Sequence, residues 1–572
     1  MKSRNNVTRR ARMGRHWLAA MALTASGGAQ AISFQLFDGS VEGNFDTTVD
    51  YGIELRTEKP QPGNLSGQYG NRYLFQDRWD VVSNMVKASH DLQLNGGWWS
   101  AFVQGNYFYD AEMDHQNLPD AARNRAVNHG DLTSAYVLTR FGPTDQFTMR
   151  LGKQVISWGE NTFIGQSLND INTVDISKLR APGVELKDAL TGTNAIYGTW
   201  AVNSAFTLEA FYLLNFDELK GDPVGGFFNT LDLAFDGGGF ATGVDGLGRP
   251  VALAPDGQSV GVDLGSIPIT RSGDRRPSSG GQFGAALRYY APNLGNGFDF
   301  GLYYEKLNDH NPQLSSTAGN PLHPGQYFVT YADAIERYGL SFNTTLGPWA
   351  VGGEYSYRRN APIQGLGFAT VAALGTDLVK GYAPGTVYQG YERYQRHQIQ
   401  VTAQRLWGPM PMFKADQWNT IGEVAYGWVG NMPGIDLNGH ATPASTPTLI
   451  AAAKAGDGFI RFDDLTRDFW GLQARSTLTY NNILFNRINM DFNTVLRWDV
   501  DGVSPELGGA KSFYRGRKAV GVGVAFDYAL RWKLAINQTF FTGGQDLHRP
   551  NGTRYASSND RDFLAIDLSY TF

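Results

Sequence analysis

The sequence predicts an all-β protein: a transmembrane antiparallel β-barrel of about 18 strands (16 to 20) with long extracellular loops and short periplasmic turns. Three observations support this fold class. Apolar and polar residues alternate along almost the whole chain, which is typical of strands with one apolar and one wet face. The links between these segments alternate between short and long. Beyond the N-terminus, no apolar run approaches the ~20 residues that a membrane-spanning helix requires.

The first 31 residues predict a secretory signal peptide. Six basic residues precede a short apolar stretch that begins at Trp17, and Ala29-Gln30-Ala31 resembles a cleavage site. We therefore expect residues 1–31 to be removed and residues 32–572 to form a single barrel domain. Removal of the six positive charges changes the formal net charge from −5 to −11. This acidic balance argues against a nucleic-acid partner. The chain has no cysteine, which excludes disulfides and thiolate metal sites.

The first and last predicted strands show the alternation clearly. In the first, Val41, Phe45, Val49, Tyr51, Ile53 and Leu55 alternate with Glu42, Asp46, Asp50, Glu54 and Arg56. In the last, "RDFLAIDLSYTF", apolar residues from Leu564 to Phe572 alternate with Ala565, Asp567, Ser569 and Thr571. We expect the apolar side to face lipid and the polar side to face the lumen. The last strand should close the barrel against the strand around Phe45 and so remove both sheet edges.

The connections distinguish a barrel from a soluble sandwich, which also alternates. Short links are expected near Leu94, Gly142, Asn203, Pro292, Gly347, Gly408, "NNIL" at Asn481 and Leu530. Long Gly-, Asp- and Pro-rich links are expected at 58–81, 111–130, 159–192, 217–281, 308–334, 361–393, 430–467, 501–515 and 544–560. An even number of strands with both termini in the periplasm places every long link outside the cell.

Three segments carry a family resemblance. They are "DGSVEGNFDTTVDYGIELR" from Asp38, "RLGKQVISWGEN" from Arg150 and "NTVDISKLRAPGVELKDALTG" from Asn172. Together they resemble an outer-membrane family catalogued as domain of unknown function 1302, over the full mature chain. The resemblance implies an outer-membrane protein of Gram-negative bacteria, from a group associated with the handling of hydrophobic compounds through the envelope. It brings no established catalytic or ligand-binding residues.

The barrel reading also implies partners. They are outer-membrane lipid and lipopolysaccharide, the barrel-assembly machinery and a small-molecule substrate of unknown identity. Tyr570 and the terminal Phe572 resemble the assembly signal common to outer-membrane proteins.

Four residues are candidates for anchoring a loop in the lumen: Arg150, Gln154, Trp158 and Glu160. They stand where a strand leaves the membrane and enters the third long link. Polar groups inside a barrel need partners, so a network of Arg150, Gln154 and Glu160 that anchors the loop is favoured over contact with a substrate.

Two long links contain apolar segments. "GLGFATVAALG" carries Leu366, Phe368, Val371 and Leu374, and "TPTLIAAAKAG" carries Leu449 and Ile450. The second segment has Thr446 as a possible N-cap and Gly456 as a stop, which predicts a short helix. These segments either pack on each other as a lid or fold inward to line an apolar site. We expect the loops at 161–190 and 361–393 to constrict the lumen.

No motif predicts an enzyme, a metal or a cofactor. "GQSVG" at Gly257–Gly261 matches a nucleophile elbow, but it lies in a long Gly-rich loop rather than at a strand-to-helix turn. The nine histidines are scattered. The favoured function is an outer-membrane channel for small hydrophobic or amphipathic molecules. The alternatives are a general diffusion porin for polar solutes and a non-transporting surface or adhesion protein.

Overall fold

The computed structural model describes residues 32–60, 74–178, 190–229, 233–235, 240–244, 250–252, 268–365, 367–376, 380–430, 432, 465–506, 512–544 and 558–572. The predicted signal peptide, the "GQSVG" segment, Leu366, Leu449 and Ile450 lie outside these residues.

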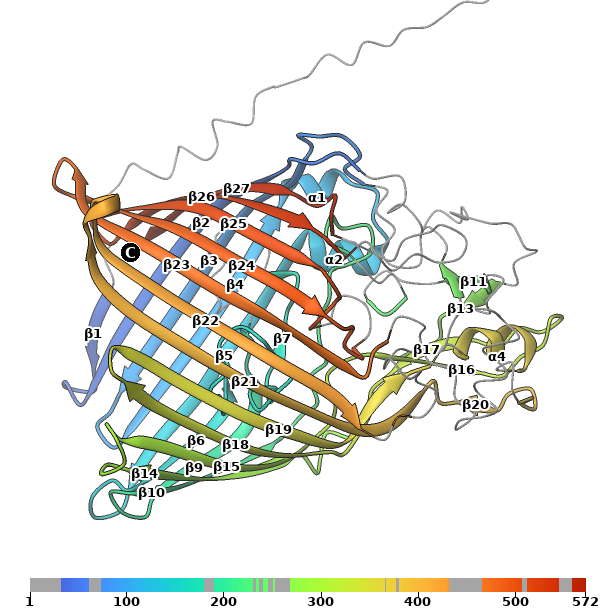
Figure 1. Ribbon diagram of the computed structural model, residues 1–572, viewed down its shortest axis with the longest axis horizontal. Coiled ribbons are helices and arrows are strands. Elements are labelled where there is room, and N and C mark those ends of the chain that lie inside the picture. Colours follow the sequence, from blue (N-terminus) through green and yellow to red (C-terminus); the bar gives the residue numbers. More distant parts are fainter. Residues whose placement is uncertain are drawn as a thin grey trace, which may run out of the picture.

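Within the described residues, eighteen antiparallel strands form a closed barrel (Figure 1). Each strand pairs with the next barrel strand along the chain, and β27 pairs with β2 to complete the cylinder. The predicted fold class is therefore confirmed. The barrel strands are β2 Val41–Arg56, β3 Val81–Asn95, β4 Trp99–Asp110, β5 Asn128–Phe141, β6 Phe147–Gln154, β9 Thr193–Ala201, β10 Phe206–Leu213, β14 Phe283–Ala291, β15 Phe298–Leu307, β18 Ile335–Leu346, β19 Trp349–Gln364, β21 Tyr391–Met410, β22 Ala415–Gly430, β23 Asp468–Leu484, β24 Ile488–Asp501, β25 Lys518–Tyr528, β26 Trp532–Thr542 and β27 Phe563–Thr571.

The two ends of the barrel differ as predicted. At one end, called the turn end here, short connections join neighbouring strands, and the chain finishes there (Figure 1). The strand ends that the long connections join lie at the opposite end, called the loop end. One predicted turn is displaced: "NNIL" continues strand β23, and the chain reverses at residues 485–487. Phe485 and Asn486 there have positive φ angles of 53° and 52°, so the turn depends on backbone conformation that the sequence pattern does not reveal.

The closing strand β27 has the two predicted faces. Its residues Leu564, Ile566 and Leu568 lie opposite Leu55, Ile53 and Tyr51 of β2. Ala565 and Asp567, on the other face, are buried. At the turn end Thr47 and Phe572 exchange backbone hydrogen bonds of 2.7 and 2.8 Å, so the last residue completes the ladder.

A short strand, β1 Ile32–Leu36, extends the seam between the two ends of the sheet. It pairs with residues 41–45 of β2. The pairing of β2 with β27 ends at Thr48, so β1 lies beside the part of β2 that is nearer to the turn end. Because β27 does not reach this part of β2, β1 covers an edge that would otherwise expose unpaired backbone groups.

The loop end carries its own small elements. Helices α1 Ala111–His115 and α2 Asp120–Ala126 lie between β4 and β5. Strands β11 Phe240–Val244, β12 Pro250–Ala252 and β13 Pro268–Thr270 form one small sheet, and β16 Gln313–Thr317, β17 Tyr327–Thr330 and β20 Val387–Tyr388 form another. With helix α4 Phe368–Leu374 these two sheets form what we call the cap, which projects beyond the barrel (Figure 1). Strands β7 Thr173–Val174 and β8 Leu190–Thr191 pair within one long connection, and a 3₁₀ turn, η3 Pro411–Phe413, closes one short turn. None of the described helices is long and apolar enough to cross a membrane.

Candidate functional site

The connection after β6 runs from residue 155 to residue 192. Its first described part, residues 155–178, folds into the lumen and is called the inward loop here. Ile156, Trp158, Leu168 and Ile171 are buried against the inner faces of β9, β10, β14 and β15. The Trp158 ring lies 4.8 Å from the Phe211 ring, and its Nε1 donates to Glu209 Oε2 at 2.7 Å. Apolar packing therefore holds the loop against this part of the wall.

Two wall glycines make room for the loop. A Cβ on Gly284 would lie 2.5 Å from the Phe211 ring and 2.8 Å from the Trp158 ring. A Cβ on Gly339 would lie 2.2 Å from Leu168. Because real Cβ contacts are not this close, any larger residue at either position would push the inward loop away from the wall.

Two glutamates on the wall bind the backbone of the inward loop. Glu423 on β22 accepts hydrogen bonds from three successive N–H groups, those of Thr162, Phe163 and Ile164, at distances of 2.5 to 3.2 Å. Glu354 on β19 accepts from the N–H groups of Glu160 and Leu168. Hydrogen bonds to a carboxylate are stronger than neutral ones, and here they satisfy backbone donors that cannot pair in a strand.

An aspartate in the loop pairs with two wall arginines. Asp170 Oδ2 lies 3.0 Å from Arg337 Nη2 and 2.7 Å from Arg358 Nη2. Burial alone would raise the pKa of the Asp170 carboxyl, but Arg358 and Arg337 outweigh burial and lower that pKa below its usual value. Arg337 also pairs with Glu305 at 2.6 Å, so these wall charges are compensated locally.

The far end of the inward loop returns to β4 and β5. Arg125 pairs with Asp175 at 2.7 Å, and Lys178 pairs with Asp131 on β5. The loop therefore contacts the wall from β9 round to β22 and then again at β5. Residues 161–178 therefore lie inside the barrel, and constriction of the lumen by residues 161–190 stays a prediction.

The four predicted anchoring residues occupy this region but bond to separate partners. Arg150 lies over the rings of Tyr136 and Tyr197, with its Cζ at 5.6 and 4.6 Å from the ring centroids. Gln154 is fully buried and donates to the backbone oxygen of Ala195 at 3.0 Å.

Glu160 uses its side chain to accept from Asn343 Nδ2 at 2.8 Å. Burial raises the pKa of the Glu160 carboxyl, and this hydrogen bond opposes the rise. The structure thus distributes the anchoring over Glu354, Glu423 and Asp170, rather than over one network of Arg150, Gln154 and Glu160.

Sequence reasoning missed Glu354, Glu423 and Asp170. Alternation places the two glutamates on lumenal faces, but many acidic residues share that pattern, and nothing in it identifies a loop backbone as the partner.

The apolar segment of the 361–393 connection lies in the cap and not in the lumen. Phe368 and Val371 are fully buried in a small core with Leu314, Tyr327 and Val329 from β16 and β17, while Leu374 is 39% exposed. The expected constriction by this loop is not what the described residues show, because Phe368 and Val371 are already covered by the neighbouring cap strands.

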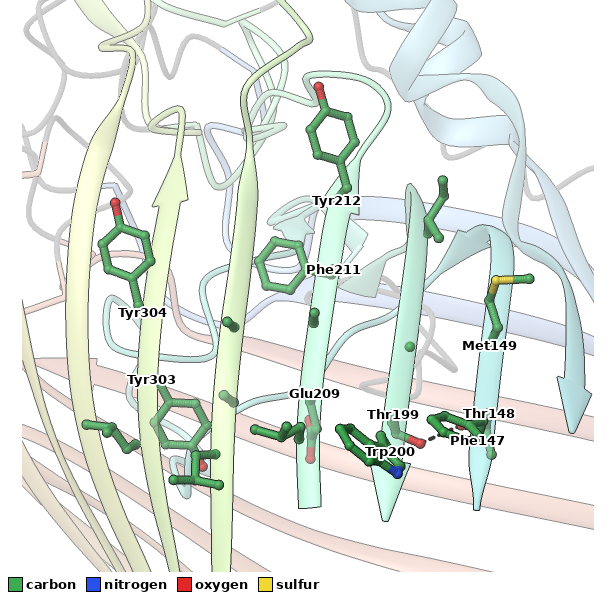
Figure 2. A pocket seen from close by; sticks show the side chains of 18 of the residues that line it. Phe147, Thr148, Met149, Thr199, Trp200, Glu209, Phe211, Tyr212, Tyr303 and Tyr304 are labelled. Atoms are coloured by element: carbon green, nitrogen blue, oxygen red, sulfur yellow. Dashed lines mark hydrogen bonds between the residues drawn. The ribbon is translucent and has the colours of Figure 1, made fainter. Parts of the chain in front are cut away.

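One cavity lies on the outer surface of the barrel. It measures about 920 Å³ and lies along the wall from β5 to β18, where Figure 2 shows Met149, Trp200, Tyr212 and Tyr304. Its floor is formed by the small residues Gly198, Ala210 and Ala285, which face one another across three strands. The alternate residues Leu208 and Tyr212 are exposed, so this groove is on the opposite face of the wall from the inward loop.

The described residues contain no group of three or more His, Cys, Asp or Glu side chains that could hold a metal ion.

Known structures of similar shape are distant in sequence. A crystal structure of OccAB1 from Acinetobacter baumannii is 10% identical, with 93% of this chain and 96% of that chain covered and a TM-score of 0.43. A crystal structure of the outer membrane protein opdK from Pseudomonas aeruginosa is 10% identical, with 93% and 98% covered and a TM-score of 0.40. No curated protein matches the chain.

A protein family matches nearly the whole chain. Residues 12–572 match the family described as "Protein of unknown function (DUF1302)", which agrees with the resemblance carried by the segments from Asp38, Arg150 and Asn172. The match includes every barrel strand and the inward loop, and the chain therefore belongs to the DUF1302 family.

Proposed function

We propose that the protein is an outer-membrane channel of a Gram-negative bacterium, through which small hydrophobic or amphipathic molecules diffuse across the membrane. The turn end would face the periplasm and the loop end the outside. The observation that carries the proposal is the inward loop, a segment of the chain folded into the lumen of a closed barrel. A barrel of this size encloses space that side chains of the wall alone do not fill, and the loop narrows that space.

The wall opposite the loop supports a passage. Inward-facing positions on β25 are Ala519, Gly521, Gly523 and Ala525, and Ala535, which lies opposite Ala525 on β26, is also small. Strand β25 therefore adds little side-chain bulk to the lumen, whereas the inward loop occupies part of it.

The distribution of charge favours uncharged or weakly charged solutes. Lumenal arginines pair with carboxylates, as Arg337 does with Glu305 and Arg396 with Glu506. Mixed, compensated charges provide no field of one sign to select ions. A diffusion porin for polar solutes is the second candidate, supported by lumenal carboxylates such as Asp46 and Asp91, which lie directly opposite each other.

Single-channel recording and vesicle uptake test the proposal together. We expect a small conductance in planar bilayers and uptake of an apolar solute into proteoliposomes faster than uptake of a sugar. A large steady current with equal uptake of both solutes would favour the porin. No current and no uptake of either solute would reject a channel and favour a surface role.

A further inference from the structure

A second, smaller cavity lies inside the barrel near the loop end. It measures about 120 Å³ and lies between the inner faces of β2 to β5 and two loop segments, residues 175–178 of the inward loop and residues 222–228. We call it the side cavity. Its volume is close to the ~150 Å³ of an engineered apolar cavity that accepts benzene, so it has the size of one six-membered ring.

One side of the side cavity is apolar and aromatic. Phe227 and Phe228 pack edge to face at 4.7 Å, and Phe228 packs in the same way on Phe563 at 5.1 Å. The guanidinium carbons of Arg56 and Arg561 lie 5.3 and 4.9 Å from the Phe227 ring centroid. These contacts fix the orientation of the rings, so an aromatic wall is formed without a ligand.

Met85, Phe108 and Met113 extend this apolar side from β3, β4 and α1. Methionine side chains adapt to irregular apolar shapes, which suits contact with rings of varied substitution.

The other side of the side cavity is polar, and its charges are already paired. Arg125 pairs with Asp175, and Lys178 pairs with Asp131 and lies 3.5 Å from Asn106 Oδ1. Asp110 accepts from Ser83 Oγ at 2.6 Å and from the N–H groups at the start of α1.

The remaining charged residues of the lining are Lys87, Glu54 and Asp222, so acidic and basic groups nearly balance. A charged solute would have to displace an existing ion pair, which is costly in a buried setting. A hydroxyl group can add a hydrogen bond to these groups and displace none of them.

We propose that the side cavity binds a neutral, ring-sized amphipathic molecule: one aromatic ring that carries a hydroxyl group. The ring would lie against Phe227, Phe228 and Met85, and the hydroxyl would face Asn106 and Lys178. This inference rests on the proposed channel function, since it names the class of molecule that the channel carries.

Three probes of similar size test the class: benzyl alcohol, benzoate and benzylamine. Their dissociation constants are measured by saturation-transfer difference NMR on the full protein in detergent micelles. Benzyl alcohol should bind at least about ten-fold more tightly than either charged probe, a difference of roughly 1.4 kcal/mol. Equal binding of all three, or tighter binding of benzoate, would overturn the proposal.

A cavity-filling variant tests the position. Met85→Trp should weaken binding of benzyl alcohol at least about ten-fold, whereas Val495→Trp on β24, outside the cavity lining, should leave it unchanged. If Met85→Trp does not fold, Phe228→Ala replaces it and should also weaken binding. Unchanged binding in a folded variant would refute the site.

Uptake into proteoliposomes separates this inference from the channel function. Uptake of benzyl alcohol above that of protein-free vesicles, equal in wild type and Met85→Trp, would reject the side cavity as part of the route while the channel function stands. Specific binding without any uptake above that of protein-free vesicles would reject the channel function while the binding site stands.

Discussion

At the scale of single residues, the inward loop depends on charges placed far apart in the sequence. Asp170 joins Arg337 and Arg358, and Glu423 binds the N–H groups of residues 162–164. In each case a loop group that has no partner in a strand binds a buried charged group of the wall. The loop and the wall therefore satisfy each other, and removal of either partner leaves a polar group unpaired.

Replacement Asp170→Asn tests this pairing. The amide keeps the shape of the side chain but leaves Arg337 and Arg358, which are 5% and 3% exposed, without their shared anion. Loss of one partner from a buried ion pair costs roughly 3 kcal/mol. We expect the free energy of unfolding, measured by urea titration in lipid vesicles, to fall by about that amount.

The stabilisation that Asp170 provides should also depend on pH. Because the pKa of Asp170 is lowered in the folded protein, its contribution is present above the unfolded pKa of ~3.9 and is lost as pH falls through the lower folded pKa. The difference between wild type and Asp170→Asn should therefore stay constant from about pH 8 to pH 5 and shrink only below about pH 4.

A matched exposed pair serves as the control for Asp170→Asn. Asp333 pairs with Arg393, and the two side chains are 66% and 30% exposed. Asp333→Asn should change the free energy of unfolding by less than about 1 kcal/mol. Equal losses in the two variants would contradict the anchoring role of Asp170.

At the scale of elements, the inward loop should act as a fixed constriction rather than a moving gate. Apolar contacts, two wall carboxylates and the Asp170 ion pairs hold it along most of its described length. Ser167 Oγ and Ser356 Oγ lie 3.1 Å apart, so cysteines at these positions can form a bridge between the loop and β19. The native chain has no cysteine, so no other disulfide competes.

The double variant Ser167→Cys/Ser356→Cys should conduct equally in its oxidised and reduced forms, because the bridge holds the loop where it already lies. Glu423→Gln, which weakens the hydrogen bonds of residues 162–164, should raise the conductance and its noise in the reduced form. Oxidation in the triple variant should restore the lower conductance. Single-channel recording with the two single-cysteine variants as controls measures this, and a loss of current on oxidation of the double variant would show that the loop moves during conduction.

The barrel strands were predictable from the sequence because a period of two depends only on neighbouring residues. Leu564, Ile566 and Leu568 identify the outer face of β27 without any knowledge of its partner. The course of the inward loop was not predictable, since its contact with Glu423 spans 259 residues and requires the curvature of the closed wall.

The cap could not be predicted from the sequence for a similar reason. "GLGFATVAALG" is apolar, but whether Phe368 packs in the lumen or under β16 and β17 depends on two other loops. Gly375, with a φ of 72°, ends helix α4 and was the available local signal for this element.

At the scale of the whole molecule, a charged residue should destabilise the barrel much more on its outer face than on its inner face. Val524 lies near the middle of β25 between Phe492 and Ile536, whereas the next residue, Ala525, lies between Asp491 and Ala535. Val524→Arg places a cation in the lipid, which costs about 2–4 kcal/mol at the midplane of the membrane. Ala525→Arg places the same cation in the lumen beside Asp491, where water and the carboxylate stabilise it.

We expect equilibrium unfolding in lipid vesicles to show a loss of about 2–4 kcal/mol for Val524→Arg and a much smaller change for Ala525→Arg. Because the two positions are adjacent, their depth in the membrane is matched. Equal losses would mean that this wall does not separate lipid from an aqueous lumen, and the channel function would fail with it.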